Sequence, residues 1–240
     1  MLYIFFMEIT KYYSPNYTKK VRSGRSITMI IIHYTGMQSE RESLKRLTSI
    51  KSKVSAHYLI GRKGEILKLV EPRYVAWHAG KSMWKKNKNL NKNSIGIELA
   101  NKGHKFGYQK FTNIQIKNLI LLCKKLKKKY KIKNQSILGH SDIAPLRKID
   151  PGEKFPWHRL SINGIGNYPK KIVVNSRYKK VQNNDQFFKN LQKIGYRYLN
   201  SKYKTKIVKN FQRKYRQKKI NGIIDLETLK LSQILSKSSN

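Results

Sequence analysis

Apolar positions in the first two thirds of the chain predict a β-sheet. A continuous run of β-branched residues over 28–34 is typical of a strand buried on both faces. In 94–99 apolar residues alternate with Gly96 and Glu98, so this strand points one carboxylate away from its apolar face. The predicted strands are these two segments, a hairpin of 56–60 and 65–70, and a short strand over 137–139.

Helical spacing of apolar residues marks two further segments. Leu44 and Leu47 predict a short surface helix within 39–50. Thr112 and Gln115 predict a capping box at the start of a long helix, whose apolar face comprises Ile116, Leu119, Ile120, Cys123, Leu126 and Tyr130. We therefore expect an α/β fold with a mixed central sheet flanked by helices.

The pattern changes after Trp157. Glycines, Pro169 and lysines predict a linker, and three short helices follow it, starting near Asn184 or Asp185, over about 204–215, and after Asp225. A three-helix unit of about 55 residues is marginal as a free domain. The predicted organisation is an N-terminal extension over 1–26, the α/β domain over 27–162, the linker over 163–182 and the helical domain over 183–238.

Charge is the most unusual feature of the composition. The 53 Lys and Arg residues outnumber 12 Asp and Glu, for a formal net charge of +41. Such a surface attracts polyanions such as nucleic acid, anionic lipid or an acidic cell-wall polymer. The lysines are spread evenly, as a compositional bias would produce, whereas a nucleic-acid site concentrates arginine on one face. We expect no specific nucleic-acid partner.

Cysteine usage and the N-terminus bear on compartment. Cys123 is the single cysteine, which excludes internal disulfides and is compatible with a reducing compartment. Residues 1–7 are apolar but lack a basic n-region and are too short for a signal sequence, and no run approaches the ~18 apolar residues of a membrane span. We expect a cytoplasmic monomer without a membrane span, with the periplasm or cell envelope as the alternative.

The stretch from Gly139 to Trp157 carries the densest chemistry. Its prolines predict an ordered loop, and Lys148 and Asp150, two residues apart, project to the same side of an extended segment. His33 and His140 each lie at the C-terminal end of a predicted strand. Two imidazoles and one carboxylate form a known catalytic zinc set with a position left for water. Six histidines allow many triplets, so the residues alone leave the ligand set open.

Several short segments occur together in one order. They are Ile31–Gly36, Val54–Ile60, Ala76–Gly80, Ser94–Leu99, Gly139–Pro145 and Arg147–Gly152. Over about residues 27–160 the chain resembles the zinc-dependent N-acetylmuramoyl-L-alanine amidases of the AmpD-like (type 2 amidase, peptidoglycan-recognition-protein-related) family. These enzymes cleave the amide between N-acetylmuramic acid and L-alanine of peptidoglycan or muropeptides.

The resemblance implies a role for each matched residue. His33, His140 and Asp150 match the zinc ligands of the family. Glu98 matches a carboxylate near the metal-bound water, and Lys148 matches a cation that stabilises the oxyanion. Without the resemblance, an ion pair with a lysine is the ordinary expectation for Glu98.

A second set of residues is expected to bind substrate. His57 and His78 match positions that line the family's substrate groove, with a structural role as the alternative. Trp77 is a candidate for stacking on sugar, although packing is the default for tryptophan. Asn101 and Arg147 are candidate partners of stem-peptide carboxylates.

Other residues of these segments receive different expectations. His104 and His158 are expected at the surface or in packing, and Asp142 is expected to orient its loop without binding metal. Where relatives often have glycine, this chain has Leu146, which puts the direction of Arg147 in question if that turn needs positive φ.

The C-terminal unit resembles the three-helix peptidoglycan-binding domain that accompanies some of these amidases, through 207–213 and 221–229. A generic helical appendage is the alternative. A non-catalytic peptidoglycan-recognition protein is the main rival to the enzyme, although such a relative would usually lack a zinc ligand. A basic nucleic-acid-binding protein is suggested by charge alone.

Overall fold

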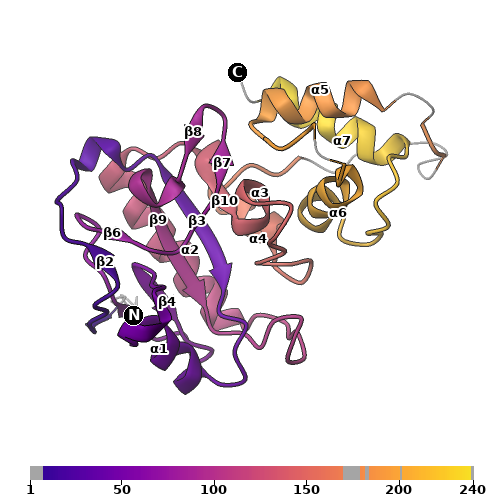
Figure 1. Cartoon of the computed structure of the whole chain (residues 1–240). Helices are drawn as coiled ribbons and strands as arrows, with labels where there is room; N and C mark the ends of the chain where they lie inside the picture. Colours follow the sequence, from indigo (N-terminus) through magenta and orange to yellow (C-terminus); the bar gives the residue numbers. More distant parts are fainter. Residues whose placement is uncertain (1–7, 170–178, 182–183, 201, 239–240) are drawn as a thin grey trace, which may run out of the picture.

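A computed structural model describes residues 8–169, 179–181, 184–200 and 202–238. At its centre is a six-stranded mixed sheet in the order β1-β5-β4-β9-β3-β10 (Figure 1). Strands β4, β9, β3 and β10 run parallel, β5 runs antiparallel to β4, and β1 runs parallel to β5. Their bounds are β1 Ile9–Lys11, β3 Met29–Tyr34, β4 Tyr58–Ile60, β5 Ile66–Lys68, β9 Ser94–Leu99 and β10 Ile137–Gly139. The expected mixed α/β sheet is confirmed.

The N-terminal segment, for which the sequence predicted no element, contributes to this sheet. Strand β1 pairs with β5, and β2 (Tyr17–Thr18) pairs antiparallel with β6 (Val75–Ala76). A second small ribbon joins β7 (Met83–Trp84) to β8 (Asn87–Lys88). Strands of two or three residues are too short to show an apolar alternation, so their pairing is visible only in the folded chain.

Helices cover the two faces of the sheet differently (Figure 1). On one face α2 (Asn113–Tyr130) and α4 (Trp157–Ile162) bury the apolar side chains of β3 and β9, and the lone Cys123 lies in this core. On the other face α1 (Glu40–Thr48) packs over β4 and β5. Short 3-10 turns occur at Gly24–Ser26, Ile50–Ser52, Leu90–Asn93 and Asn134–Ser136. Within the described residues, no helix is both long and apolar enough to cross a bilayer.

The start of α2 corrects one prediction. Thr112 caps the helix as expected, because its hydroxyl accepts a hydrogen bond from the Gln115 amide at 3.2 Å. The reciprocal half of the capping box is wrong. The fully buried Gln115 side chain instead donates to the carbonyls of Ile60 and Ala100, at 3.0 and 3.1 Å. Gln115 thereby joins the end of β4 to the residue that follows β9 through buried hydrogen bonds, which outweighs a local cap.

The three predicted C-terminal helices are present as α5 (Asp185–Ile194), α6 (Lys204–Tyr215) and α7 (Leu226–Lys237). They pack against one another and against the open half of the sheet, beside α3 (His140–Ile143) (Figure 1). Their core includes Phe187 and Phe211 together with Met29, Ile31 and Leu138. This shared core compensates for the small size of the unit. Half of the predicted linker, 170–178 and 182, lies outside the described residues.

Candidate metal centre and its groove

Three buried side chains converge where β3 and β10 end. The Nδ1 atoms of His33 and His140 lie 2.9 Å apart, and Oδ2 of Asp150 lies 3.2 Å from each of them. Exposed fractions of 1%, 3% and 6% put all three out of bulk water. The resemblance of the sequence motifs to the amidase family predicted this set of three residues.

A chain of hydrogen bonds fixes the protons of His33. The Leu90 carbonyl can only accept, so the Ser94 hydroxyl, 2.5 Å away, donates to it. The Ser94 oxygen then accepts from Nε2 of His78 at 3.2 Å, which leaves Nδ1 of His78 to accept from Nε2 of His33 at 3.0 Å. Nδ1 of His33 therefore presents a lone pair to the centre.

A single hydrogen bond gives His140 the same proton arrangement. Its Nε2 donates to the Ala79 carbonyl at 3.1 Å, so its Nδ1 also presents a lone pair. Burial, followed by the charge of His140, lowers the pKa of His33 to about 4, which keeps the ring neutral. Two lone pairs and a carboxylate facing one another repel unless a cation lies between them. Their separations are close to the ~3.3 Å edge of a tetrahedral zinc site, so the donor set fits a metal.

Local structure explains how the sequence brings these residues together. Strand alternation sends Ile30 and Ile32 to the α2 face and His33 to the opposite face. In the same register Glu98 of β9 lies beside His33. His140 follows β10 directly, at the strand end where it was predicted, and it is the first residue of the short helix α3.

Asp142 stays outside the donor set and holds the loop, as expected. Its Oδ2 accepts from the Gly139 amide at 2.8 Å and from the Lys214 ammonium at 2.5 Å. Its Oδ1 accepts from the Tyr196 hydroxyl at 2.6 Å. Burial, and then the Asp142 carboxylate, raise the pKa of Tyr196 well above its usual range, so the phenol remains a donor.

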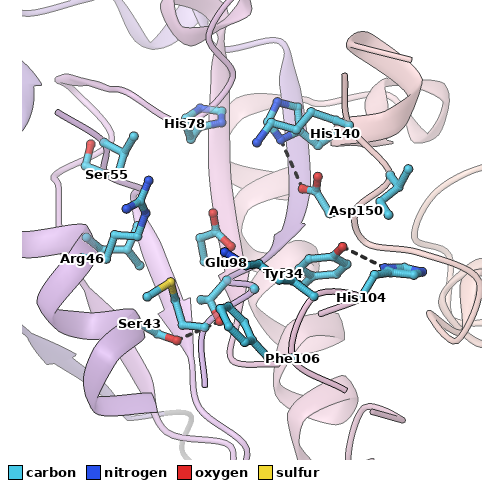
Figure 2. A pocket seen from close by; sticks show the side chains of 18 of the residues that line it. Tyr34, Ser43, Arg46, Ser55, His78, Glu98, His104, Phe106, His140 and Asp150 are labelled. Carbon is cyan, nitrogen blue, oxygen red and sulfur yellow. Dashed lines mark hydrogen bonds and ion pairs between the residues drawn. The ribbon is translucent and has the colours of Figure 1, made fainter. Parts of the chain in front are cut away.

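His140 and Asp150 line a groove of about 730 Å³ between α1 and the loop of Asp150 (Figure 2). Glu98 lies on its floor, and among the described residues its buried Oε2 has no hydrogen-bond partner. Burial, followed by the Asp150 carboxylate, raises the pKa of Glu98 to about 8, against the opposing charges of Lys148 and Arg46. The buried carboxylate on the floor therefore holds a proton more readily than an exposed glutamate does.

The two walls of the groove both carry cations. Lys148 and Arg147 line one wall, and Arg46 of α1 lines the other, opposite Asp150 (Figure 2). Sequence reasoning missed Arg46, because a charged residue on a surface helix gives no signal until the helix is placed.

His104 was expected at the surface or in packing, and this expectation was incomplete. It lines the groove, where its Nδ1 contacts the Tyr34 hydroxyl at 2.9 Å and its Nε2 contacts Glu153 at 3.1 Å. Tyr34, which lies next to the donor His33 in sequence, was also missed.

The structure separates the five predicted substrate contacts into two groups. Trp77 and Arg147 line the groove, and so does His78, although both His78 nitrogens are engaged by His33 and Ser94. His57 and Asn101 do not line it. His57 is fully buried and accepts from the Gly96 amide, while Asn101 donates to the Gln109 carbonyl, so their side chains serve internal hydrogen bonds here.

The question raised by Leu146 has a direct answer. Leu146 is not among the residues with positive φ, so the turn forms without glycine. Arg147 folds back over the rim of the groove, where its guanidinium donates to the carbonyls of Ala79 and Lys81. Its direction is therefore set by backbone acceptors.

A mixed sheet with a buried two-histidine, one-carboxylate donor set on the floor of a groove defines a metal-dependent hydrolase class. Residues 23–153 match the family model described as N-acetylmuramoyl-L-alanine amidase, and the chain belongs to this family.

Individual relatives agree with this assignment. The chain is 40% identical over 161 residues to the N-acetylmuramoyl-L-alanine amidase AmiD of Escherichia coli, a match that covers 62% of this chain and 57% of AmiD. The chain thus spans little more than half the length of that relative. It is 34% identical to the 1,6-anhydro-N-acetylmuramyl-L-alanine amidase AmpD of Haemophilus influenzae, covering 61% of this chain and 86% of AmpD.

Solved structures extend the similarity to the C-terminal helices. The structure of AmiD from E. coli with the substrate anhydro-N-acetylmuramic acid-L-Ala-D-gamma-Glu-L-Lys has a TM-score of 0.81 at 32% identity, covering 89% of this chain and 90% of that one. AmpDh3 from Pseudomonas aeruginosa gives a TM-score of 0.81 at 29% identity, covering 93% and 96%.

His57 gives folding stability a testable pH dependence. Burial, and then the charge of Arg22, lower the pKa of His57 to about 3, from an ordinary value of 6.5. Between these values the unfolded chain binds the extra proton, so the free energy of unfolding falls as the pH drops below 6.5. We expect His57→Gln to reduce this slope by up to ~1.4 kcal/mol per pH unit in urea unfolding experiments.

The exposed His158 supplies the matched control. His158→Gln also removes one imidazole, but from a ring exposed to water, and should leave the slope unchanged. A His57→Gln slope equal to that of the wild type would show that His57 is not kept neutral by burial.

Proposed function

We propose that this protein hydrolyses the amide bond between N-acetylmuramic acid and L-alanine in muropeptides or peptidoglycan, using one zinc ion. The observation that carries the proposal is the convergence of His33, His140 and Asp150 beside Glu98 and Lys148 in one groove. Family membership supports it. So does the anhydromuramyl peptide named as the substrate of AmiD.

His33, His140 and Asp150 would hold the zinc ion. When bound, zinc supplies a Lewis acid that activates water and polarises the scissile carbonyl. The second nitrogens of both histidines are held by His78 and the Ala79 carbonyl, so the ligand rings are oriented before metal binds.

Glu98 and Lys148 divide the remaining work. Glu98 accepts the proton of the attacking water and passes it to the leaving nitrogen of L-alanine, a role that suits a carboxylate with a pKa near neutrality. Lys148 stabilises the negative oxygen of the tetrahedral intermediate, an interaction stronger in the transition state than in the ground state.

We propose in addition that α5–α7 contact peptidoglycan. The resemblance of 207–213 and 221–229 to a peptidoglycan-binding domain supports this, as does the net charge of +41 toward carboxylate-bearing polymers. An enzyme of released muropeptides would work in the cytoplasm, which remains our proposal, and an enzyme of intact peptidoglycan would work in the envelope.

The activity is tested by incubating the purified protein with a defined anhydromuramyl tripeptide and with intact peptidoglycan. Mass spectrometry should detect free stem peptide, and a chelator should abolish its release. Lys148→Ala should retain one zinc per chain while kcat falls by about 10²–10³-fold, because only the oxyanion contact is lost. Binding of substrate without release of peptide, even with added zinc, would favour the recognition protein over the enzyme.

Arg46 generates a prediction about substrate affinity. In the peptide of the AmiD complex, D-gamma-Glu leaves its α-carboxylate free, and Arg46 presents a cation on the wall opposite the metal site. We expect Arg46→Ala to raise KM by about five- to tenfold with little change in kcat, because an exposed charge-assisted hydrogen bond is lost. Steady-state kinetics measures both constants.

Two controls make this prediction specific. Arg41→Ala removes an exposed charge from the same helix, away from the groove, and should leave KM unchanged. A tripeptide amidated at the glutamyl carboxylate should bind wild type and Arg46→Ala equally. If Arg46→Ala still weakens binding of the amidated peptide, the partner of Arg46 is another group.

A further inference from the structure

Helix α6 makes buried contacts with the loop that carries Lys148 and Asp150. The centre of this contact is Asn210, which is 2% exposed. Its Nδ2 group donates to two backbone carbonyls of that loop, Pro145 at 2.8 Å and Lys148 at 3.0 Å. The two N–H groups of one side-chain amide therefore bind the first and the last residue of a four-residue turn.

The turn is also held by hydrogen bonds within the loop and by the guanidinium of Arg147, which donates to the carbonyls of Ala79 and Lys81. The amides of Arg147 and Lys148 both donate to the Ala144 carbonyl, at 3.1 and 3.0 Å, which closes the turn from inside. Asn210 bonds to the carbonyls of the first and last residues of the turn, and the side chain of that last residue, Lys148, lines the groove. Loss of the amide would leave two acceptors without their donor next to the metal ligand Asp150.

The orientation of Asn210 is fixed in turn by a network that reaches two further residues of the groove, His104 and Tyr34. Its Oδ1 accepts from Nη1 of Arg213 at 2.8 Å, which identifies the Nδ2 atom as the donor toward the loop. Arg213 lies 3.6 Å from Glu153, and Glu153 contacts His104, which contacts the Tyr34 hydroxyl. The groove is thus tied to α6 at two points.

Asp142 connects the turn before the metal ligand His140 to the C-terminal helices in a similar way. Its carboxylate joins the turn before His140 to Lys214 of α6 and to Tyr196, and the Lys214 ammonium lies 4.2 Å from the centre of the Trp157 ring. The turn before His140 and the loop that carries Lys148 and Asp150 are therefore both hydrogen-bonded to the C-terminal helical unit.

We propose that Asn210 is a positioning residue for Lys148, and that the C-terminal helices complete the amidase site. The inference rests on the proposed function in one respect, because it takes Lys148 as the cation that stabilises the oxyanion of the tetrahedral intermediate. Asn210 holds the Lys148 backbone so that the ammonium faces the groove before substrate arrives, and its removal costs turnover rather than substrate affinity.

A matched residue separates this role from ordinary packing. Asn190 is also a buried asparagine of the C-terminal helices, 3% exposed, and its Nδ2 donates to the Ser232 hydroxyl at 2.9 Å between α5 and α7. Asn190→Ala removes a comparable hydrogen bond from the same helical unit without touching the loop.

The experiment compares Asn210→Ala and Asn190→Ala in the full-length zinc-loaded chain, below the unfolding temperature of both variants. We expect Asn210→Ala to lower kcat by about tenfold or more with KM near that of the wild type, and Asn190→Ala to change kcat by less than about threefold. In a Lys148→Ala background the additional loss of kcat from Asn210→Ala should disappear, because the group that it positions is absent.

Hydrogen exchange gives a readout that does not depend on activity. Peptides covering 145–150 should exchange faster in Asn210→Ala, but not in Asn190→Ala, at equal zinc content. The inference is overturned if both variants lose kcat equally, if the loss persists in the Lys148→Ala background, or if exchange over 145–150 is unchanged. Absence of peptide release by the wild type would instead count against the proposed function, while the exchange result still decides the inference.

Discussion

The site depends on a row of hydrogen bonds that begins at a backbone carbonyl. Because the Leu90 carbonyl can only accept, the protons of Ser94, His78 and His33 must all point the same way, and the last ring is left with a lone pair on Nδ1. The His78 ring lies so close to strand β9 that the strand residue facing it must have no side chain. Gly96 fills that position, since a Cβ there would lie 2.3 Å from the His78 ring. A metal ligand is therefore prepared by residues that never contact the metal.

The division of the sheet into two faces explains where the groove forms. One face is fully covered by α2 and α4, and it supplies the main core. The other face is covered from two ends, by α1 over β4 and β5 and by the C-terminal helices over β3 and β10. The gap left between these covers is the groove, with Glu98 on its floor. The C-terminal helices therefore support one wall of the groove. They are also the unit for which we propose contact with peptidoglycan.

Much of the fold and part of the site could be predicted from the sequence, for identifiable physical reasons. Period-two alternation in 94–99 predicted that Glu98 points away from the apolar face of its strand, and the motifs in their order led to His33, His140 and Asp150. That His33 and Glu98 lie side by side follows from the register of β3 and β9 in the folded chain. The two-residue and three-residue strands, the buried role of Gln115 and the groove position of Arg46 could not be predicted, because each depends on which distant segment packs beside it. Asn210 looked like one polar residue of a helix until its two carbonyl partners were placed.

We propose that His33, His140 and Asp150 bind one zinc ion through the three atoms that converge at the ends of β3 and β10. A crystal structure of the zinc-loaded protein, with anomalous diffraction measured at the zinc absorption edge, tests it most directly. We expect one peak per chain, about 2.0–2.2 Å from Nδ1 of both histidines and from an oxygen of Asp150. An empty centre at saturating zinc, or a peak bound by Nε2 or by other residues, would contradict it.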